Sequence, residues 1–542
     1  MVQVLVFVVL GLAALAVYYY VTIPAINIHS SGTWAAMMLL LVLLLALLVG
    51  RQFKKSGQDA VEGAVLRFRL KEMGLTVKLL GGLILVLGVI YVAGSLLSSP
   101  FFNASKYQKL LTIQERAFTD DIKEVDYKTI PLLDKDSASL LGNRKMGSMV
   151  DMVSQFEVSG DYSQINYQGK PVRVTPLTYA SPIKWLTNQR GGIPAYILID
   201  MTTQNTECVK LTEGIKYSKG EYFNRNIYRH LRFRYPTYIF DDQIFFEIDE
   251  EGTPYWVCPV KKFNIGLFGG QTIGRVVLCN AQTGECVDYA VEDVPQWIDK
   301  VYSADLLVNL YDYSGLLKHG YWNSLLGQRD CLQSTHGYNY IALEDDVWVY
   351  TGVTSVSGDQ SNVGFVLMNQ RTMETRYYKV EGAIEDSAMS SAEGQVQNLG
   401  YRSTFPLLLN IADEPTYFMA LKDGAGLVKK YAMVNVQKYQ WVAIGDTVQE
   451  CEKNYMELLN TNGIVSAAAE SNKSVSGKIE SISPVVLGGN SHYYICLVGQ
   501  DDIFDVDMTD ASLVTIIKYQ VGDQVTFQYA EGYGVNEVKD IS

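Results

Sequence analysis

Apolar residues follow two different patterns along the chain. Residues 2–21, 34–50 and 79–97 are almost continuously apolar, whereas residues 194–440 alternate between apolar and polar positions in short runs. A membrane-spanning helix needs about 20 apolar residues to cross ~30 Å of hydrocarbon, and a buried helix of a soluble protein normally keeps a polar face. The pattern therefore predicts three transmembrane helices followed by a large body of short strands and helices.

Charged residues predict how these helices are oriented. Residues 51–78 hold seven Lys or Arg, and residues 24–33 hold none. Loops rich in Lys and Arg stay in the cytoplasm, so we expect a cytoplasmic N-terminus and loop 51–78, and an extracytoplasmic body after about residue 98. No basic residue precedes the first apolar stretch, and "VYYYVTIPA" lacks a small-residue cleavage site, which favours an uncleaved anchor over a signal peptide.

The body repeats one hairpin phrase three times. The copies read "YILIDMTTQNTECVKLTEG" (196–214), "VVLCNAQTGECVDY" (276–289) and "FVLMNQRTMETRYYKVEG" (365–382). The last two share the turn motif N-x-x-T-x-E, formed by Asn280, Thr283 and Glu285 and by Asn369, Thr372 and Glu374. Short Asn and Thr side chains bond their own backbone in turns. Each hairpin precedes a helix-like segment and two more strands, so we expect three repeats, at 191–272, 273–360 and 361–445.

The phrase "NAQTGE" and the order of elements around it resemble the PepSY-type α+β modules of bacterial envelope proteins, over about residues 194–440. The chain as a whole is similar to multi-span envelope proteins of Gram-positive bacteria. The resemblance implies an extracytoplasmic binding or regulatory module and no catalytic residue.

The flanking regions complete an α+β chain. Residues 1–99 form the membrane anchor, 100–190 a connector and α+β subdomain, and 446–474 a helix with a polar linker. Residues 475–542 contain about five short strands separated by Gly-rich turns, which is typical of a small OB-like or SH3-like barrel.

Composition restricts the possible partners. The net charge is −13, and no block of basic residues occurs in the body. Binding to nucleic acid requires clustered Lys and Arg, so we expect no nucleic-acid partner.

The residues that normally carry chemistry are sparse. There are five His, and no zinc-protease helix, nucleophile elbow, phosphate-binding loop or closely spaced Cys/His cluster. We therefore predict no catalytic residue, metal or cofactor. Acidic turns at 249–251, 344–346 and 413–414 recur in each repeat, and two interpretations stay open: a Ca²⁺ site or solvated carboxylates.

Two of the seven Cys form the sharpest candidate site. If residues 281–284 form the loop of the second hairpin, Cys279 and Cys286 face each other across its strands. Cross-strand pairs lie at a distance that a disulfide can bridge. The alternatives are a pair of buried thiols in a core, or a shifted strand register in which the two cysteines do not face each other.

Together these features predict a non-catalytic, multi-pass membrane protein that acts as an extracytoplasmic scaffold or binding protein of the bacterial envelope. Its expected partners are the lipid bilayer and another envelope protein, with no small-molecule cofactor. The alternatives are regulation of a secreted or membrane peptidase through the PepSY-like modules, a cell-wall hydrolase, or an accessory subunit of a transporter.

Overall fold

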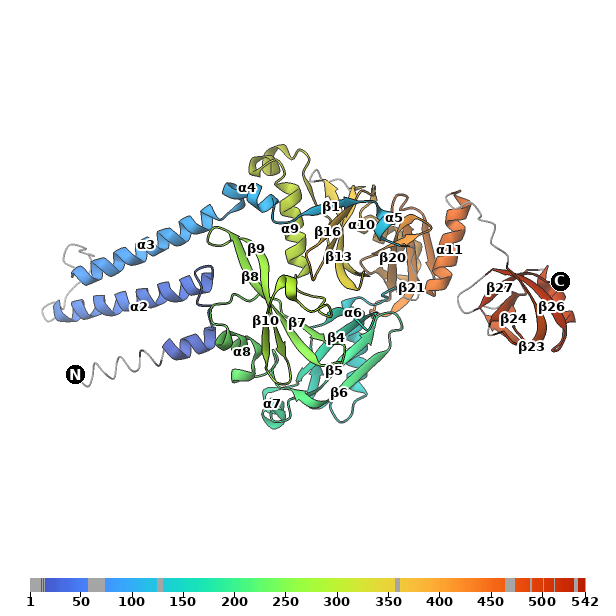
Figure 1. The fold of residues 1–542 in the computed structure, drawn as a ribbon, viewed down its shortest axis with the longest axis horizontal. Coiled ribbons are helices and arrows are strands. Elements are labelled where there is room, and N and C mark those ends of the chain that lie inside the picture. Colours follow the sequence, from blue (N-terminus) through green and yellow to red (C-terminus); the bar gives the residue numbers. More distant parts are fainter. Residues whose placement is uncertain are drawn as a thin grey trace. The chain divides into compact units, whose positions relative to one another are not determined.

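The computed structural model describes residues 11, 13, 15–56, 74–123, 130–355, 361–463, 473–487, 490–500, 502–510, 512–530 and 535–541. These residues form two compact units, one of residues 1–429 with 434–440 and one of residues 430–433 with 441–542. Figure 1 shows the helices and strands of both units under the labels used below. Both units mix helices and strands, which confirms the predicted α+β class.

Two long apolar helices precede the body. α2 covers Ser31–Ser56 and α3 covers Leu75–Leu97, and both contain an apolar window long enough to cross a membrane. Only 6% of the first window and 0% of the second is buried. The core helix of a soluble protein would be mostly buried, so the exposure of these apolar side chains indicates membrane association. The predicted first span, 2–21, lies largely outside the described residues.

The segment that leads into α2 lies at the same end of these helices as the body. The backbone N–H of Ile26 donates to the carbonyl of Pro236 at 2.8 Å, and a ring nitrogen of His29 lies 2.7 Å from the carbonyl oxygen of Leu267. At the end of α3, the hydroxyl oxygen of Ser98 accepts a hydrogen bond from the backbone N–H of Leu267 at 2.7 Å. The turn that contains Leu267 therefore contacts the residues that adjoin both helices at their body ends.

The body of the first unit consists of four helix-and-sheet modules. Module 1 (residues 130–215) contains α6 (Lys135–Gly147), β2 (Phe156–Val158), β3 (Ser163–Tyr167), β4 (Lys170–Tyr179), α7 (Pro182–Asn188), β5 (Ile193–Asp200) and β6 (Thr206–Ile215). Strands β2 and β3 both pair with β4, and the sheet continues through β5 to β6. Module 2 (residues 227–290) contains α8 (Ile227–Arg234), β7 (Phe245–Ile248), β8 (Pro254–Ile265), β9 (Gly269–Asn280) and β10 (Cys286–Ala290), in the sheet order β7-β8-β9-β10.

Modules 3 and 4 follow the same plan. Module 3 (residues 304–378) contains α9 (Ala304–Leu316), β11 (Leu332–Ser334), β12 (Asn339–Leu343), β13 (Asp346–Ser355), β15 (Gly364–Asn369) and β16 (Thr375–Tyr378). Module 4 (residues 385–435) contains α10 (Glu385–Gln395), β18 (Arg402–Ser403), β19 (Leu407–Ile411), β20 (Glu414–Lys422) and β21 (Val428–Asn435), of which residues 430–433 belong to the second unit. Before module 1 come α4 (Pro100–Gln108), β1 (Ile113–Arg116), which pairs parallel with β16, and α5 (Phe118–Asp121). A two-stranded ladder joins β14 (Ser361–Asn362) to β17 (Gly382–Ala383).

The order of elements in each predicted repeat agrees with the structure, but the predicted boundaries do not follow the sheets. The boundary at 272/273 falls inside β9, and β9 pairs with β8 of the preceding repeat along most of its length. Likewise β4 pairs with β5 across 190/191, and β13 pairs with β15 across 360/361. Consecutive strands joined by short connections tend to pair, so each sheet combines the last two strands of one repeat with the first two of the next.

The core lies between neighbouring sheets because the sheet of module 2 is covered on both faces. Successive residues of a strand point to opposite faces. Trp256, Cys258 and Val277 belong to the hydrophobic cluster shared with module 1, whereas Val257 and Val276 belong to the cluster shared with α9 and module 3. Stacking the modules thus buries apolar surface that a single small sheet would leave exposed.

The second unit contains β22 (Val442–Gly445), α11 (Val448–Thr461), β23 (Lys473–Leu487), β24 (Asn490–Leu497), β25 (Ile503–Asp507), β26 (Gln524–Ala530) and β27 (Asn536–Ile541). Five of these strands close into a barrel in the order β23-β24-β25-β27-β26, with β25 and β27 parallel. The small C-terminal barrel predicted for 475–542 is therefore confirmed.

Candidate functional site

A cavity of about 520 Å³ is lined by residues of all four modules and of the segments that connect them. Six aromatic side chains contribute to its wall: Tyr162, Phe245, Phe246, Tyr338, Tyr340 and Phe405. Charged side chains complete the lining, and two of them, Arg173 and Lys300, are buried. A concave, partly aromatic cavity with a few converging polar groups is the usual form of a small-molecule site.

Arg173 places a fixed positive charge in the cavity wall. It lies in β4 between Val172 and Val174, and all three side chains are buried. Its partner across the β3–β4 pair is Gln164, whose side-chain oxygen accepts a hydrogen bond from Nη2 of Arg173 at 3.2 Å. Nε of Arg173 has no hydrogen-bond partner among the described residues. Burial lowers the pKa of Arg173, but a guanidinium stays charged at physiological pH.

Lys300 supplies a second buried cation. Its side chain is 5% exposed and belongs to the segment between β10 and α9. Nζ lies 4.8 Å from the ring centre of Tyr340 and 5.7 Å from that of Phe245. Burial, and secondly the charge of Arg173, lower the pKa of Lys300 to about 8. Within the described part of the chain, neither Lys300 nor Arg173 takes part in an ion pair.

The acidic groups around the cavity do not neutralise these two cations. Each lining aspartate is already paired with a lysine: Asp134 with Lys422 at 2.5 Å, Asp161 with Lys219 at 2.7 Å, and Asp242 with Lys261 at 2.8 Å.

Glu247, which is close to Lys300 in space, is fully buried, and its carboxylate accepts hydrogen bonds from the backbone N–H groups of Asp299 and Lys300, both at 3.0 Å. Burial raises the pKa of Glu247 to about 7 and also raises the pKa of Asp299. Near neutral pH, much of the positive charge of Arg173 and Lys300 is therefore uncompensated, and the cavity favours an anion.

A second group of reactive side chains lies in module 2. Cys279 and Cys286 are partners across the β9–β10 pair, as the sequence predicted. In the neighbouring pair, the backbone N–H of Asn280 donates a hydrogen bond to the carbonyl oxygen of Glu285 at 2.8 Å. Hydrogen-bonded and non-hydrogen-bonded pairs alternate in antiparallel sheets, so the two cysteines occupy a close, non-hydrogen-bonded pair. Both thiols are free in the structure, and the predicted disulfide stays a prediction.

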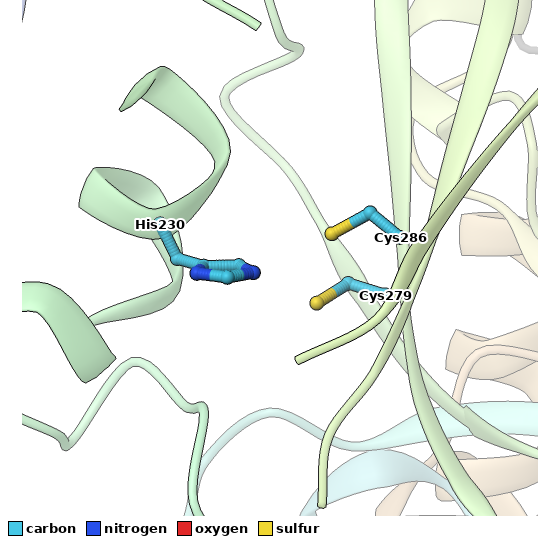
Figure 2. A group of neighbouring side chains, drawn as sticks. All are labelled: His230, Cys279 and Cys286. Atoms are coloured by element: carbon cyan, nitrogen blue, oxygen red, sulfur yellow. The ribbon is translucent and has the colours of Figure 1, made fainter. Parts of the chain in front are cut away.

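His230 of α8 joins the two cysteines. Figure 2 shows its imidazole extending from α8 toward both sulfur atoms. One ligand atom from each of the three residues lies within 4.8 Å of the others. Cys279 is fully buried, Cys286 is 8% exposed and His230 is half-buried. The sequence has no closely spaced Cys/His cluster, and these three residues meet because the fold brings His230 from a separate helix.

Hydrogen bonding polarises this cluster. The thiol of Cys279, and after it the imidazole of His230, lower the pKa of Cys286 to about 5. The same contact with Cys286 raises the pKa of Cys279 and of His230. Cys286 is thus the thiolate of the pair at neutral pH, and two sulfurs with an imidazole are ligands that zinc and copper(I) prefer.

The predicted turn residues lie at the tips of equivalent hairpins. The side-chain oxygen of Asn280 accepts hydrogen bonds from the backbone N–H groups of Gln282 and Thr283 at 2.9 and 3.0 Å. Asn369 does the same with Arg371 and Thr372 at 2.8 and 2.9 Å. The hydroxyl oxygens of Thr283 and Thr372 accept hydrogen bonds from the backbone N–H groups of Glu285 and Glu374, each at 3.2 Å. These residues hold the turns, and none of them lines the cavity.

The structure contains further copies of this turn. Asp200 accepts hydrogen bonds from the backbone of Thr202 and Thr203 at 2.8 and 2.9 Å. Asn435 accepts them from Gln437 and Lys438 at 3.1 and 2.8 Å. Sequence reasoning missed the copy at Asn435 because it lacks the Thr and Glu of the motif.

Two carboxylates of the acidic turn at 344–346 have ion-pair partners within the chain. Asp346 pairs with Arg371 at 2.7 Å, and Glu344 pairs with Arg376 at 2.8 Å. These carboxylates therefore stabilise module 3, which agrees better with a structural role than with a cation site.

Sequence reasoning also missed Arg173, Lys300 and His230. A signal for Arg173 exists, because it is the one charge inside the apolar run "VRVTPL" of β4. A charge in a strand covered on both faces has to meet a partner or a ligand. Lys300 and His230 stand in ordinary polar surroundings in the sequence, and only the fold brings them to their sites.

The chain matches no protein-family model and no curated protein at a significant level. The resemblance to PepSY-type modules therefore stays a prediction.

Proposed function

We propose that this chain is a membrane-anchored binding protein whose body takes up a small organic anion in the basic cavity. The observation that carries the proposal is the pair Arg173 and Lys300, two buried cations without an ion-pair partner among the described residues, both lining a cavity of about 520 Å³. Leaving charges buried and unpaired costs free energy. A carboxylate or phosphate group in the cavity would supply the missing partner.

The cavity also restricts the rest of the ligand. Its volume is typical of sites for metabolite-sized molecules, which range from roughly 300 to 1,000 Å³. The guanidinium of Arg173 suits two-point contact with a phosphate or carboxylate. Phe245 and Tyr340 offer apolar ring surface beside the cations. The ligand class is therefore an anion that also carries a ring or an apolar portion.

Location and partners follow from the anchor. The segment around Ile26 and the body lie at one end of the helices, and the basic segment 51–78 connects the opposite ends. Under the rule that positive loops stay inside, the body and its cavity face away from the cytoplasm. This location supports a binding protein of the cell envelope that is in contact with the bilayer. That it is non-catalytic and binds another envelope protein is part of the proposal.

Binding can be measured on the full-length chain in detergent. Thermal unfolding is followed with inorganic phosphate, a dicarboxylate, a sugar phosphate and a nucleoside monophosphate, each against chloride at equal ionic strength. We expect at least one anion to raise the melting temperature of the wild type and not that of Arg173→Gln. The matched control is Arg402→Gln, because Arg402 is exposed and pairs with Glu393.

Two results would contradict the proposal. One is a wild type that responds to none of the anions and carries no small anion by mass spectrometry of the denatured protein. The other is an anion-dependent shift that Arg173→Gln retains.

A further inference from the structure

Module 2 holds a cluster of soft ligands that the anion-binding proposal does not use. We propose that His230, Cys279 and Cys286 bind one zinc ion, with a fourth coordination position left for an exchangeable ligand. Two sulfurs and one imidazole form a ligand set known from zinc sites that keep an open position. The site is independent of the basic cavity.

The three ligand atoms are already close to zinc-binding distances. They lie within 4.8 Å of one another. With Zn–S bonds of about 2.3 Å and Zn–N bonds of about 2.0 Å, ligand atoms of a tetrahedral site stand roughly 3.5–3.8 Å apart. Side-chain movements of about 1 Å would close the site, and the backbone of the β9–β10 pair can stay in place.

The imidazole is held in position from two sides. Its ring packs against Tyr217, with 4.5 Å between ring centres, and its Nε2 lies 2.7 Å from the carbonyl oxygen of Gly284. Gly284 stands in the turn between the two cysteines with a φ of +74°, and a Cβ there would lie 2.4 Å from the ring of Tyr217. Glycine thus allows the turn, the tyrosine and the histidine to meet, which fixes the imidazole beside both sulfurs.

When the ion binds, it replaces one contact of the imidazole and the protons of the cluster. When Nε2 binds the ion, its contact with the carbonyl of Gly284 is replaced by the Zn–N bond. Both sulfurs bind as thiolates, and any proton that they or the imidazole carry is released to solvent. A disulfide between Cys279 and Cys286 would use the same two sulfurs, so the bridge and the ion exclude each other.

The test uses the full-length chain, reduced, freed of metal with a chelator and then titrated with Co²⁺ alone. Cobalt takes the place of zinc and makes the site visible. We expect a thiolate-to-cobalt charge-transfer band in the near ultraviolet, visible bands of a tetrahedral site, one equivalent of Co²⁺ per chain, and their loss when Zn²⁺ is added.

Two variants each remove one proposed ligand, and a third serves as the control. Cys286→Ser and His230→Gln should weaken Co²⁺ binding by at least about 100-fold, since even loss of an outer-shell partner costs 10- to 100-fold. The Gln side chain can still donate a hydrogen bond to the carbonyl of Gly284, so His230→Gln removes the ligand and leaves the fold supported. Cys208→Ser, at a half-buried cysteine of β6, is the matched control and should bind as the wild type does.

Each outcome either supports or overturns the proposed metal site. Thiolate–cobalt bands in the wild type and Cys208→Ser, lost in Cys286→Ser and His230→Gln, support the site. Absence of these bands in the reduced wild type overturns it, as does their persistence in Cys286→Ser. Circular dichroism of the variants separates loss of a ligand from loss of the fold.

Discussion

Lys300→Met tests whether the basic cavity carries a positive charge that no ion-pair partner within the protein neutralises. The pKa of Lys300 is lowered from an ordinary value of 10.5 to about 8, chiefly by burial, and its side chain is 5% exposed. At about 1.4 kcal/mol for each tenfold change in proton affinity, the charged form is disfavoured by roughly 3 kcal/mol. Methionine has a similar length and carries no charge. The variant also loses the attraction between Lys300 and Glu247, which offsets part of this gain. We therefore expect a net gain in stability of about 1–3 kcal/mol at pH 7.

The same reasoning predicts a pH dependence. Between about pH 8 and pH 10.5 the unfolded chain keeps the proton of Lys300, whereas the folded chain has released it. Stability rises with pH wherever the unfolded state binds more protons, so this residue makes the wild type more stable across that window. Lys300→Met lacks the contribution, and the difference between the two proteins should shrink as the pH rises from 8 to 10.5.

Thermal unfolding of the full-length chain at pH 7, 8, 9 and 10 measures both effects. At roughly 1 °C per kcal/mol for a chain of this length, the variant should melt about 1–3 °C above the wild type at pH 7 and should lose any anion-dependent shift. The matched control is Lys422→Met, which deprives Asp134 of its partner at 2.5 Å and should destabilise the protein by about 1–3 kcal/mol. If Lys300→Met lowers the melting temperature as the control does, or keeps a constant offset at every pH, the charge of Lys300 is satisfied within the protein and the reasoning fails.

Three further predictions concern other parts of the chain. Gly284→Ala should destabilise the protein by about 2–4 kcal/mol in urea unfolding, because the new Cβ clashes with the Tyr217 ring and the backbone has a positive φ. Gly320→Ala is the control: it has a φ of +87° but nothing within 4 Å of the new Cβ, and it should cost only about 1 kcal/mol. Equal costs for the two variants would refute the packing argument. Asn435→Ala should lower stability by about 1 kcal/mol, since it removes the side-chain acceptor for two backbone N–H groups; no loss in thermal unfolding would mean that the turn at Asn435 does not need its Asn. Trp322 is 62% exposed and packs on Phe101 just beyond α3, so in nanodiscs its fluorescence, taken as the difference from Trp322→Phe, should be quenched by brominated lipids; quenching by aqueous iodide alone would place it away from the bilayer.

The hairpins could be predicted from sequence because their signals are local. Apolar alternation marks the strands, and Asn280 or Asn369 marks the turn, so the register that places Cys279 opposite Cys286 follows from a few neighbouring residues. The closed barrel could also be predicted from local patterns, because its five short strands are separated by Gly-rich turns. Interactions within about ten residues therefore carried most of the correct assignments.

The sheet partners and the sites depend on distant contacts. The residues near position 272 contain no signal that β9 pairs with β8 instead of belonging to a separate sheet. Arg173 and Lys300 are more than a hundred residues apart and meet only because modules stack. His230 reaches the cysteines through the packing of α8 on its own sheet. Single-sequence patterns contain the strands but not the way in which they associate.

Module 2 lies next to both apolar helices and contributes to both proposed sites. Through Leu267, its β8–β9 turn contacts the residues that adjoin the body ends of both apolar helices. Its β7 supplies Phe245 to the wall of the basic cavity, and its β9–β10 hairpin carries the two cysteines. Because these strands form one hydrogen-bonded sheet that is buried on both faces, a shift of one of them has to be accommodated by the others. Under the proposed function, an occupant of either site would act on the same sheet that lies against the body ends of the two apolar helices, and this contact would connect ligand binding to the membrane.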